Sequence, residues 1–287
     1  MRKIAPANVD FATALAESVR GISDIDTQRI YVASIPDPKA IEEAYLASAY
    51  SGVLCSMPRT VGNGDPIVYG SLHKSELMKL YTQYFVQKGK PARELYDLIK
   101  VSAGGKCPLC GGVGSVRTLD HYLPKSTFPL YSVMPANLVP CCRDCNTDKL
   151  DGFSESPDKQ ALHPYFDDSK FFTEKWIEAK VVPGLPPVIE YYVSAPENWS
   201  ERDKSRVSCH FKYYRLASKF SVEAAADIPE TIHVRRTIMS SISPYDFSMY
   251  LFEKGQTPAL PINNWRRVMF SALAMDPWFC ENLFDEI

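Results

Sequence analysis

Residues 107–149 open with Cys107-Pro-Leu-Cys110 and close with Cys142-Arg-Asp-Cys145-Asn146-Thr-Asp-Lys149. The two Cys-x-x-Cys pairs are separated by 31 residues. Each pair can place two thiolates on one tight turn, and two such turns complete the tetrahedral shell of a zinc ion with no open position. The spacing therefore predicts a structural Zn²⁺ site. Any chemistry must come from the residues that this site holds in place.

Three polar residues lie inside this frame or directly after it: Asp120, His121 and Asn146. A neutral imidazole, with a pKa near about 6.5, can take a proton from water at cytosolic pH. A carboxylate and an amide oxygen are hard ligands suited to Mg²⁺. On a regular strand Asp120 and His121 would point to opposite faces, so a bend is needed for them to act together. The simpler alternative for His121 is a hydrogen-bonded core or surface histidine.

The other four cysteines follow no spacing pattern: Cys55, Cys141, Cys209 and Cys280. Scattered cysteines are typical of small buried hydrophobes in a reducing compartment. Cys141 is adjacent to Cys142 and could compete with it as a zinc ligand. The spacing favours Cys142, because two residues then separate it from Cys145.

The expected fold class is α+β, with mainly helical flanks around a small zinc-stabilised ββα core. We expect an N-terminal helical region over residues 1–103, the core over 104–155, and a mixed, mostly helical region over 156–287. Strands are predicted over residues 116–123 and 188–193. Apolar periodicity predicts helices near residues 12–19, 71–86, 200–219, 229–242, 244–254 and 262–275, and prolines open two more at Pro38 and Pro91.

Composition places the chain among ordinary globular proteins. Of the 287 residues, 45% are hydrophobic and 23% are charged, a balance that is usual for soluble domains. The first ten residues lack the apolar stretch of a secretory signal. No run approaches the roughly 18 apolar residues that a membrane helix needs. We therefore expect a cytoplasmic protein with no membrane association.

The central motif resembles the HNH, or ββα-metal, endonucleases. The resemblance is carried by Cys107-x-x-Cys110, Asp120-His121, Asn137-Leu-Val-Pro140 and Cys142-x-x-Cys145-Asn146-x-x-Lys149. Within that family the motif is similar to the HNH subunits of Septu-type and retron-associated anti-phage systems, which work beside an ATPase. One departure is that the final histidine of the family name is Asn146 here, as in many members.

The resemblance implies a role for each matching residue. His121 is the expected general base that activates water. Asp120 and Asn146 are the expected ligands of a catalytic Mg²⁺ or Mn²⁺, and Asn137 ties the loop so that His121 stays oriented. The expected activity is metal-assisted hydrolysis of DNA phosphodiester bonds. The alternative is a non-catalytic zinc module that binds nucleic acid or a protein.

Three cations surround the motif and could position phosphates: Lys125, Arg143 and Lys149. Solvated surface charges are an equally good interpretation of each one taken singly. Residues 104–150 hold five Lys or Arg against three Asp, while the rest of the chain holds 27 basic and 31 acidic residues. Non-specific DNA affinity needs concentrated cations. The thin surplus, and the lack of a P-loop sequence, favour docking to a partner protein, such as the ATPase that the resemblance implies.

Overall fold

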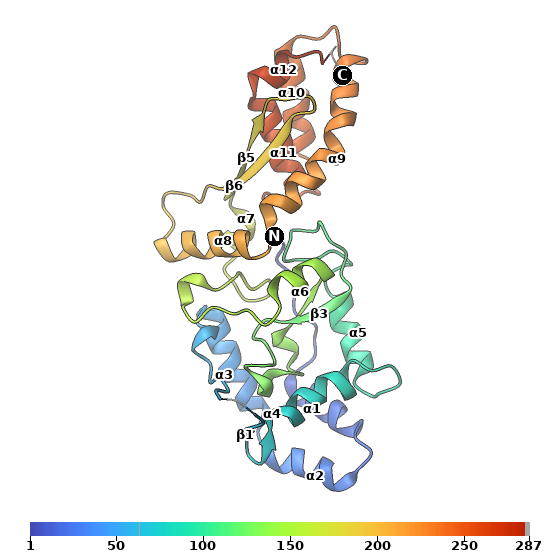
Figure 1. Ribbon diagram of the computed structural model, residues 1–287, viewed down its shortest axis with the longest axis vertical. Helices are drawn as coiled ribbons and strands as arrows, with labels where there is room; N and C mark the ends of the chain where they lie inside the picture. The colour runs from blue at the N-terminus through green and yellow to red at the C-terminus, as the bar shows by residue number, and fades with distance from the viewer. Residues whose placement is uncertain (63, 285–287) are drawn as a thin grey trace. The chain divides into compact units, whose positions relative to one another are not determined.

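The computed structural model describes residues 1–62 and 64–284 and consists of two compact units (Figure 1). The N-terminal unit comprises Lys3–Leu109 and Gly114–Asp167. The C-terminal unit comprises the chain from Asp168 on, together with Met1–Arg2 and Cys110–Val113. Among the described residues, no helix has both the length and the apolar character needed to cross a bilayer.

The N-terminal unit is mainly helical. Its α-helices are α1 (Phe11–Arg20), α2 (Ile25–Ser34), α3 (Pro38–Tyr50), α4 (Lys74–Lys79), α5 (Arg93–Val101) and α6 (Arg143–Lys149). Shorter helical turns are η1 (Leu54–Ser56), the π-helix η2 (Leu80–Phe85), η3 (Pro129–Tyr131), η4 (Pro135–Asn137) and η5 (Pro157–Lys159). Two antiparallel strand pairs complete it: β1 (Ile67–Tyr69) with β2 (Leu72–His73), and β3 (Thr118–His121) with β4 (Leu138–Cys141).

Capping residues account for where several of these helices begin. The Asp10 carboxylate accepts a hydrogen bond of 2.7 Å from the Thr13 amide and so caps α1. Asp37 caps α3 in the same way, and Pro38 fills its first position, where a missing amide proton costs nothing. The apolar face of α1 is buried, with Phe11 inaccessible to solvent.

The strand pair β3–β4 and the following helix α6 form the centre of the N-terminal unit. The register pairs Thr118 with Cys141 and His121 with Leu138. All four residues of β4 are buried, because α5 packs against β3 and β4 while α6 packs against β3. The last residues of β3 are therefore held between packed elements, which fixes the backbone of Asp120 and His121.

The C-terminal unit consists of one antiparallel strand pair covered by helices. Its elements are α7 (Lys170–Thr173), β5 (Ile177–Val182), β6 (Val188–Val193), α8 (Glu201–Tyr213), α9 (Leu216–Arg236), α10 (Pro244–Gly255), α11 (Trp265–Met275) and α12 (Pro277–Glu281). α9 packs against β6 and α11 packs against β5, and α10 lies alongside α11 (Figure 1). The core between them is aromatic, with Trp176, Phe220 and Phe270 almost wholly buried.

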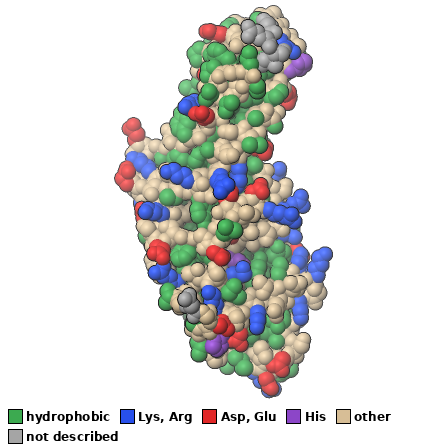
Figure 2. Space-filling model, in the orientation of Figure 1, with side chains coloured by type: hydrophobic (Ala, Val, Ile, Leu, Met, Phe, Trp, Pro, Cys, Tyr) green, Lys and Arg blue, Asp and Glu red, His purple; other side chains and the backbone are tan. Residues whose placement is uncertain are grey.

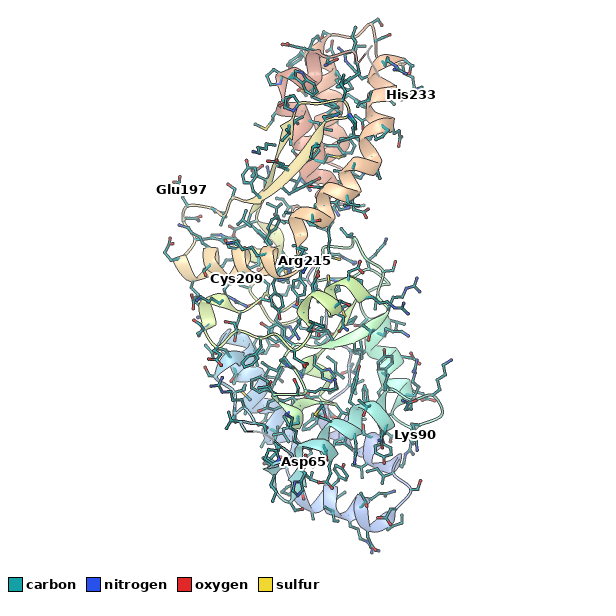
Figure 3. The ribbon with its side chains drawn as sticks, viewed as in Figure 1. Asp65, Lys90, Glu197, Cys209, Arg215 and His233 are labelled. Carbon is teal, nitrogen blue, oxygen red and sulfur yellow. The ribbon has the colours of Figure 1, made fainter. Side chains whose placement is uncertain are left out.

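The expected mixed class of helices with little strand is confirmed, but several element boundaries were wrong. The single helix expected over residues 71–86 is instead β2, α4 and the π-helix η2. The break expected before Pro229 lies at Arg215, which has a φ of +49° and separates α8 from α9 (Figure 3). α9 continues through Pro229 because Phe220 and Ile228 are buried on one face, and packing outweighs helix propensity.

The division into residues 1–103, 104–155 and 156–287 stays a prediction. The N-terminal unit contains most of the first two predicted regions together with residues 156–167. The strand expected over residues 188–193 is β6, whereas its partner β5 was not expected. The two strands pair along their full length, from Ile177 with Val193 to Val182 with Val188.

Candidate functional site

The four cysteines of the two Cys-x-x-Cys pairs come together in the structure: Cys107, Cys110, Cys142 and Cys145. All four are buried, and their Sγ atoms lie within 4.8 Å of one another. A tetrahedral Zn²⁺ with bonds of about 2.3 Å needs sulfur atoms about 3.8 Å apart, so this cluster can coordinate zinc. Gly111 and Gly112, with φ of +68° and +97°, reverse the chain directly after the first pair.

Cys142, and not its neighbour Cys141, belongs to this cluster. Cys142 is the N-cap of α6, and its Sγ accepts a hydrogen bond of 3.4 Å from the Cys145 amide. Cys141 is fully buried at the end of β4, where it pairs with Thr118. The sequence left open whether Cys141 or Cys142 is the ligand. The backbone decides it, because consecutive residues of an extended chain face opposite sides.

A pocket of about 210 Å³ lies beside the end of β3. Its walls come from β3, from the loop after β3 and from the last turn of α6: Asp120, His121, Pro124, Lys125, Asn146, Thr147, Leu150 and Asp151. Asp120 and His121 face one pocket although they are adjacent in sequence. The pocket therefore collects the three polar residues singled out from the sequence, Asp120, His121 and Asn146.

The His121 ring is held in one orientation. Its Nε2 lies 2.8 Å from the carbonyl oxygen of Ser132, and a carbonyl can only accept, so Nε2 carries the proton. The ring packs edge-on against Tyr81, with 4.3 Å between ring centroids. Burial, together with the charge of Lys125, lowers the pKa of His121 to about 3, against the hydrogen bond to Ser132, which raises it. The imidazole is therefore neutral at neutral pH, with the lone pair on Nδ1.

Asp120 forms a buried ion pair with Lys149. The Lys149 Nζ lies 3.0 Å from one Asp120 carboxylate oxygen and 3.2 Å from the other. It also donates to the backbone carbonyl of His121. Both side chains are nearly inaccessible, at 4% and 6% exposure. Burial raises the pKa of Asp120, and the neighbouring Lys149 charge opposes that rise. The lysine thus connects α6 to the end of β3 rather than pointing to solvent, where a phosphate contact was expected.

Asn137 is fully buried and takes no part in the pocket lining. Its side-chain oxygen accepts from the Leu123 amide at 2.7 Å and from the Tyr45 hydroxyl at 3.0 Å. Its side-chain nitrogen donates to the carbonyls of Leu123 and Tyr131, at 3.0 and 3.2 Å. Three of these bonds close the loop between β3 and β4, and the bond from Tyr45 ties that loop to α3. That loop carries Ser132, the residue that holds the His121 ring.

The remaining residues expected at the site differ in position. Asn146 is half-buried on α6, and no group in residues 1–62 and 64–284 hydrogen-bonds its side chain. Lys125 is half-buried and lines the pocket, whereas Arg143 is exposed on the first turn of α6 and does not line it. Outside the predicted site, His163 is buried among aromatic rings of the N-terminal unit, with 4.3 Å between its ring centroid and that of Tyr122.

Several residues that shape the site gave no signal in the sequence. Tyr81 and Ser132 lie 40 residues before and 11 residues after His121, so only the folded chain brings them to its ring. Leu150 was also missed, although it stands at the pocket rim. A helical or strand period could not have identified these residues, because they reach the end of β3 from loops or from the π-helix η2.

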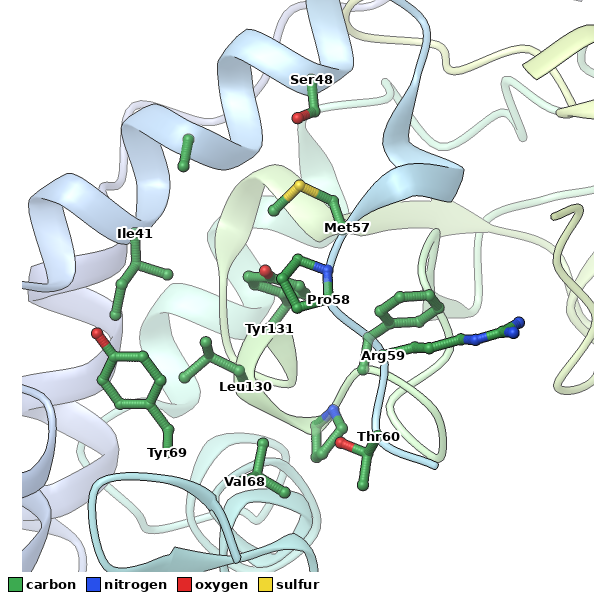
Figure 4. Close-up of a pocket in the computed structure, with 13 residues that line it drawn as sticks. Ile41, Ser48, Met57, Pro58, Arg59, Thr60, Val68, Tyr69, Leu130 and Tyr131 are labelled. Atoms are coloured by element: carbon green, nitrogen blue, oxygen red, sulfur yellow. The ribbon is translucent and has the colours of Figure 1, made fainter. Parts of the chain in front are cut away.

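A second, larger pocket of about 360 Å³ lies in the same unit, between α3, β1 and η3 (Figure 4). Its walls are mostly apolar, with Ile41, Met57 and Leu130 turned toward one another. It contains none of the residues expected at a site, and it adjoins the loop of Ser132 through Tyr131.

Basic side chains are not concentrated on the visible surface. Figure 2 shows Lys and Arg interspersed with Asp and Glu and with apolar side chains. This fits a formal net charge of −2 for the whole chain. Among the described residues that line the pocket, Lys125 is the one Lys or Arg.

Comparison with known proteins gives one relationship and two negative results. No family model matches the chain, and no solved structure matches it. The chain is 35% identical, over 288 aligned positions, to protein ea31 of Escherichia phage lambda. The alignment covers 96% of this chain and 97% of ea31. At that identity, over nearly the full length of both proteins, the chain belongs to the same family as phage lambda ea31.

Proposed function

We propose that this protein is a metal-dependent endonuclease of the HNH, or ββα-metal, type that hydrolyses phosphodiester bonds of DNA. The observation that carries the proposal is the small pocket at the end of β3. It combines a neutral, oriented imidazole with a carboxylate and an amide, next to a cysteine cluster able to hold zinc.

His121 is the general base in this proposal. Its Nε2–H is engaged by the Ser132 carbonyl, so Nδ1 is left to accept a proton. The depressed pKa keeps that nitrogen unprotonated. A water molecule in the pocket loses its proton to Nδ1 as its oxygen attacks the phosphorus atom, and the bond from phosphorus to the leaving 3′ oxygen breaks, with that oxygen taking a proton from solvent. Tyr81 packs against the ring and prevents it from swinging away.

Asp120 and Asn146 are the groups that would hold Mg²⁺ or Mn²⁺. They fit that role because both line the pocket and offer a carboxylate and an amide oxygen, the donors that Mg²⁺ accepts. The Asn146 side chain is not used in the fold, and Lys149 holds the Asp120 carboxylate in place. A divalent ion there stabilises the charge that develops on the phosphate and the leaving oxygen.

The zinc and Asn137 have structural roles. Four cysteines close the zinc shell, so no position remains for substrate. The cluster anchors the start of α6, which carries Asn146, Lys149 and the pocket rim. Asn137 fixes the loop that positions Ser132 and therefore His121.

The test is cleavage of supercoiled plasmid by purified, zinc-loaded protein, with and without added Mg²⁺ or Mn²⁺, the ions that a carboxylate and an amide oxygen can hold. We expect nicking that needs the added metal and is lost in His121→Ala. His233→Ala is the matched control, because His233 is exposed on α9 (Figure 3). Zinc content is measured in every sample.

Wild-type protein that holds zinc, binds nucleic acid and cuts no DNA with either metal would favour the alternative, a non-catalytic zinc module. Cleavage by His121→Ala at the wild-type rate would remove the catalytic assignment. An ATPase partner and a role in anti-phage defence remain part of the proposal through the sequence resemblance alone. The name of the phage relative states no activity.

A further inference from the structure

The residue that ends α6 has an unusual backbone. Leu150 has φ +48° and ψ −129°, which lies outside the left-handed helical region as well as the two common ones. Such a conformation costs about 1–3 kcal/mol for a residue other than glycine. Helices commonly end on glycine or asparagine at positive φ. Gly152 follows two residues later, so a glycine is available nearby but does not occupy the strained position.

The Leu150 side chain gains nothing from the fold that would offset this strain. It is 72% exposed, so its isobutyl group faces water. It stands at the rim of the pocket that contains Asp120, His121 and Asn146. A strained backbone at a residue that lines a chemical site points to a contact with a ligand, and the exposed isobutyl group is the part of Leu150 available to make it.

We propose that Leu150 contacts the substrate by inserting its side chain between two stacked bases of duplex DNA, next to the phosphate that is attacked. This rests on the proposed nuclease function and adds to it the way in which the substrate is engaged. Apolar side chains that insert between base pairs unstack them, and the resulting bend opens the backbone to the protein.

The pocket rim offers groups for both parts of a nucleotide, the charged phosphate and the apolar base. Lys125 offers a cation for a phosphate, and the exposed Leu150 side chain offers apolar surface for a base or sugar. Asp151 also lines the rim, and its carboxylate repels phosphate on the Leu150 side. The backbone of the DNA is therefore directed toward Lys125 and the bases toward Leu150.

Insertion at this point predicts where the protein cuts. Pyrimidine–purine steps such as TA and CA/TG unstack most easily. The cost of inserting Leu150 is lowest there. Cut sites should be enriched at these steps although no side chain reads a base edge.

The experiment uses the full-length protein and a short duplex with 2-aminopurine beside a TA step, in Ca²⁺ without Mg²⁺. 2-Aminopurine fluoresces more strongly when it is unstacked. We expect a several-fold rise in fluorescence with wild-type protein and none with Leu150→Gly. Leu150→Gly should be at least as stable as wild type, because glycine relieves the strain at φ +48°. The control is Leu98→Ala, an exposed leucine on α5 outside the pocket.

Cleavage with Mg²⁺ is measured on the same duplex and on one with an unpaired base at that step. We expect Leu150→Gly to cut the intact duplex at least ten-fold more slowly, and to regain wild-type cutting within two-fold on the unpaired duplex. A fold defect alone could not produce that rescue. Equal fluorescence and equal cutting by Leu150→Gly and wild type would overturn the insertion while leaving the nuclease proposal intact.

The fluorescence measurement also separates the two proposals when no cleavage is seen. A fluorescence rise with wild type, lost in Leu150→Gly, supports insertion and counts against catalysis. No rise and no cleavage with wild type overturns both. A rise that Leu150→Gly retains overturns the insertion, whatever the cleavage result.

Discussion

Lys149 and Asp120 form an ion pair in which both side chains are almost completely shielded from water, with 3.0 Å between Nζ and the nearer oxygen. The same ammonium donates to the His121 carbonyl. One residue of α6 thus fixes a side chain and a backbone group at the end of β3. Removing the cation leaves a buried carboxylate without its partner, which costs far more than the net value of the pair.

Lys149→Met should therefore lower the free energy of unfolding by about 3–5 kcal/mol, as measured by urea denaturation. The double variant Lys149→Met/Asp120→Asn should recover part of that loss, because no uncompensated charge remains. Lys125→Met is the control, since Lys125 is half-buried at the pocket and outside this pair. A single Lys149→Met variant as stable as wild type would contradict the buried pair.

The two asparagines of the motif should behave oppositely. Asn137→Ala removes four hydrogen bonds inside the core and should cost about 2–4 kcal/mol of stability. Asn146→Ala removes a half-buried side chain with no bonding role in the fold and should change stability by less than about 1 kcal/mol. It should nevertheless abolish metal-dependent cleavage. Thermal unfolding and plasmid nicking, measured side by side, check both, and equal stability losses would argue against this division.

Cys107→Ser should lose the zinc and the stability of the N-terminal unit together. Zinc binding supplies an apparent free energy on the order of 10 kcal/mol in isolated finger peptides. Metal analysis of freshly purified protein gives the zinc content, and thermal unfolding gives the stability. Cys209→Ser is the control, because Cys209 is a half-buried residue of α8 outside the cluster (Figure 3). Wild-type protein that contains no zinc would show the assignment to be wrong.

Asp203 should make the C-terminal unit sensitive to acid. Burial raises the pKa of Asp203, but hydrogen bonds from Lys170, at 2.6 Å, and Ser200, at 2.7 Å, outweigh it and hold the pKa below its ordinary value. The folded state therefore keeps the carboxylate charged at a pH where the unfolded chain takes up a proton. The stabilisation is present above about pH 3.9, and it is lost as the pH falls through the folded pKa.

Asp203→Asn should accordingly cost about 1 kcal/mol at pH 7, with a difference from wild type that shrinks below about pH 3.9. Tryptophan fluorescence follows this unit alone, because its four tryptophans are the only ones in the sequence: Trp176, Trp199, Trp265 and Trp278. Glu197→Gln is the control, since Glu197 is exposed (Figure 3). A pH-independent difference would contradict the assignment.

The isolated chain should bind and cut DNA weakly at physiological salt. Its formal net charge is −2, and phosphate neutralisation by clustered cations supplies most non-specific affinity. A partner protein, such as the ATPase that the resemblance implies, should raise cleavage. Cleavage rates between about 50 and 200 mM salt, the range over which such affinity falls steeply, test this. Strong, salt-tolerant cutting by the lone chain would remove the need for a partner.

The cysteine cluster was predictable because the Cys-x-x-Cys spacing is a local feature of the sequence. Two Cys-x-x-Cys turns bring four thiolates together whatever surrounds them, and the fold only had to close the loop between Cys110 and Cys142. A ββα core was expected from the sequence, and β3, β4 and α6 follow one another in that order. One pocket is lined by Asp120, His121 and Asn146, the three residues that the sequence motif had singled out.

What the sequence could not predict depends on tertiary packing. Lys149 was expected in solvent, because an isolated lysine on a short helix usually is. Its burial follows from α6 packing against β3, which turns Lys149 toward Asp120. Tyr81 contacts the His121 ring from the π-helix η2, and no sequence period identifies a contact between residues so far apart in the chain.

The cysteine cluster also has a topological consequence. Cys107 with Cys110, and Cys142 with Cys145, join the two ends of the segment that carries the pocket, so a bound zinc ion acts as a second connection parallel to the backbone. A cut of the peptide chain near Thr127 would then leave the two pieces linked through the metal and through the paired strands β3 and β4. Two polypeptides that divide the chain near Thr127 should therefore associate more tightly with zinc bound than after chelation.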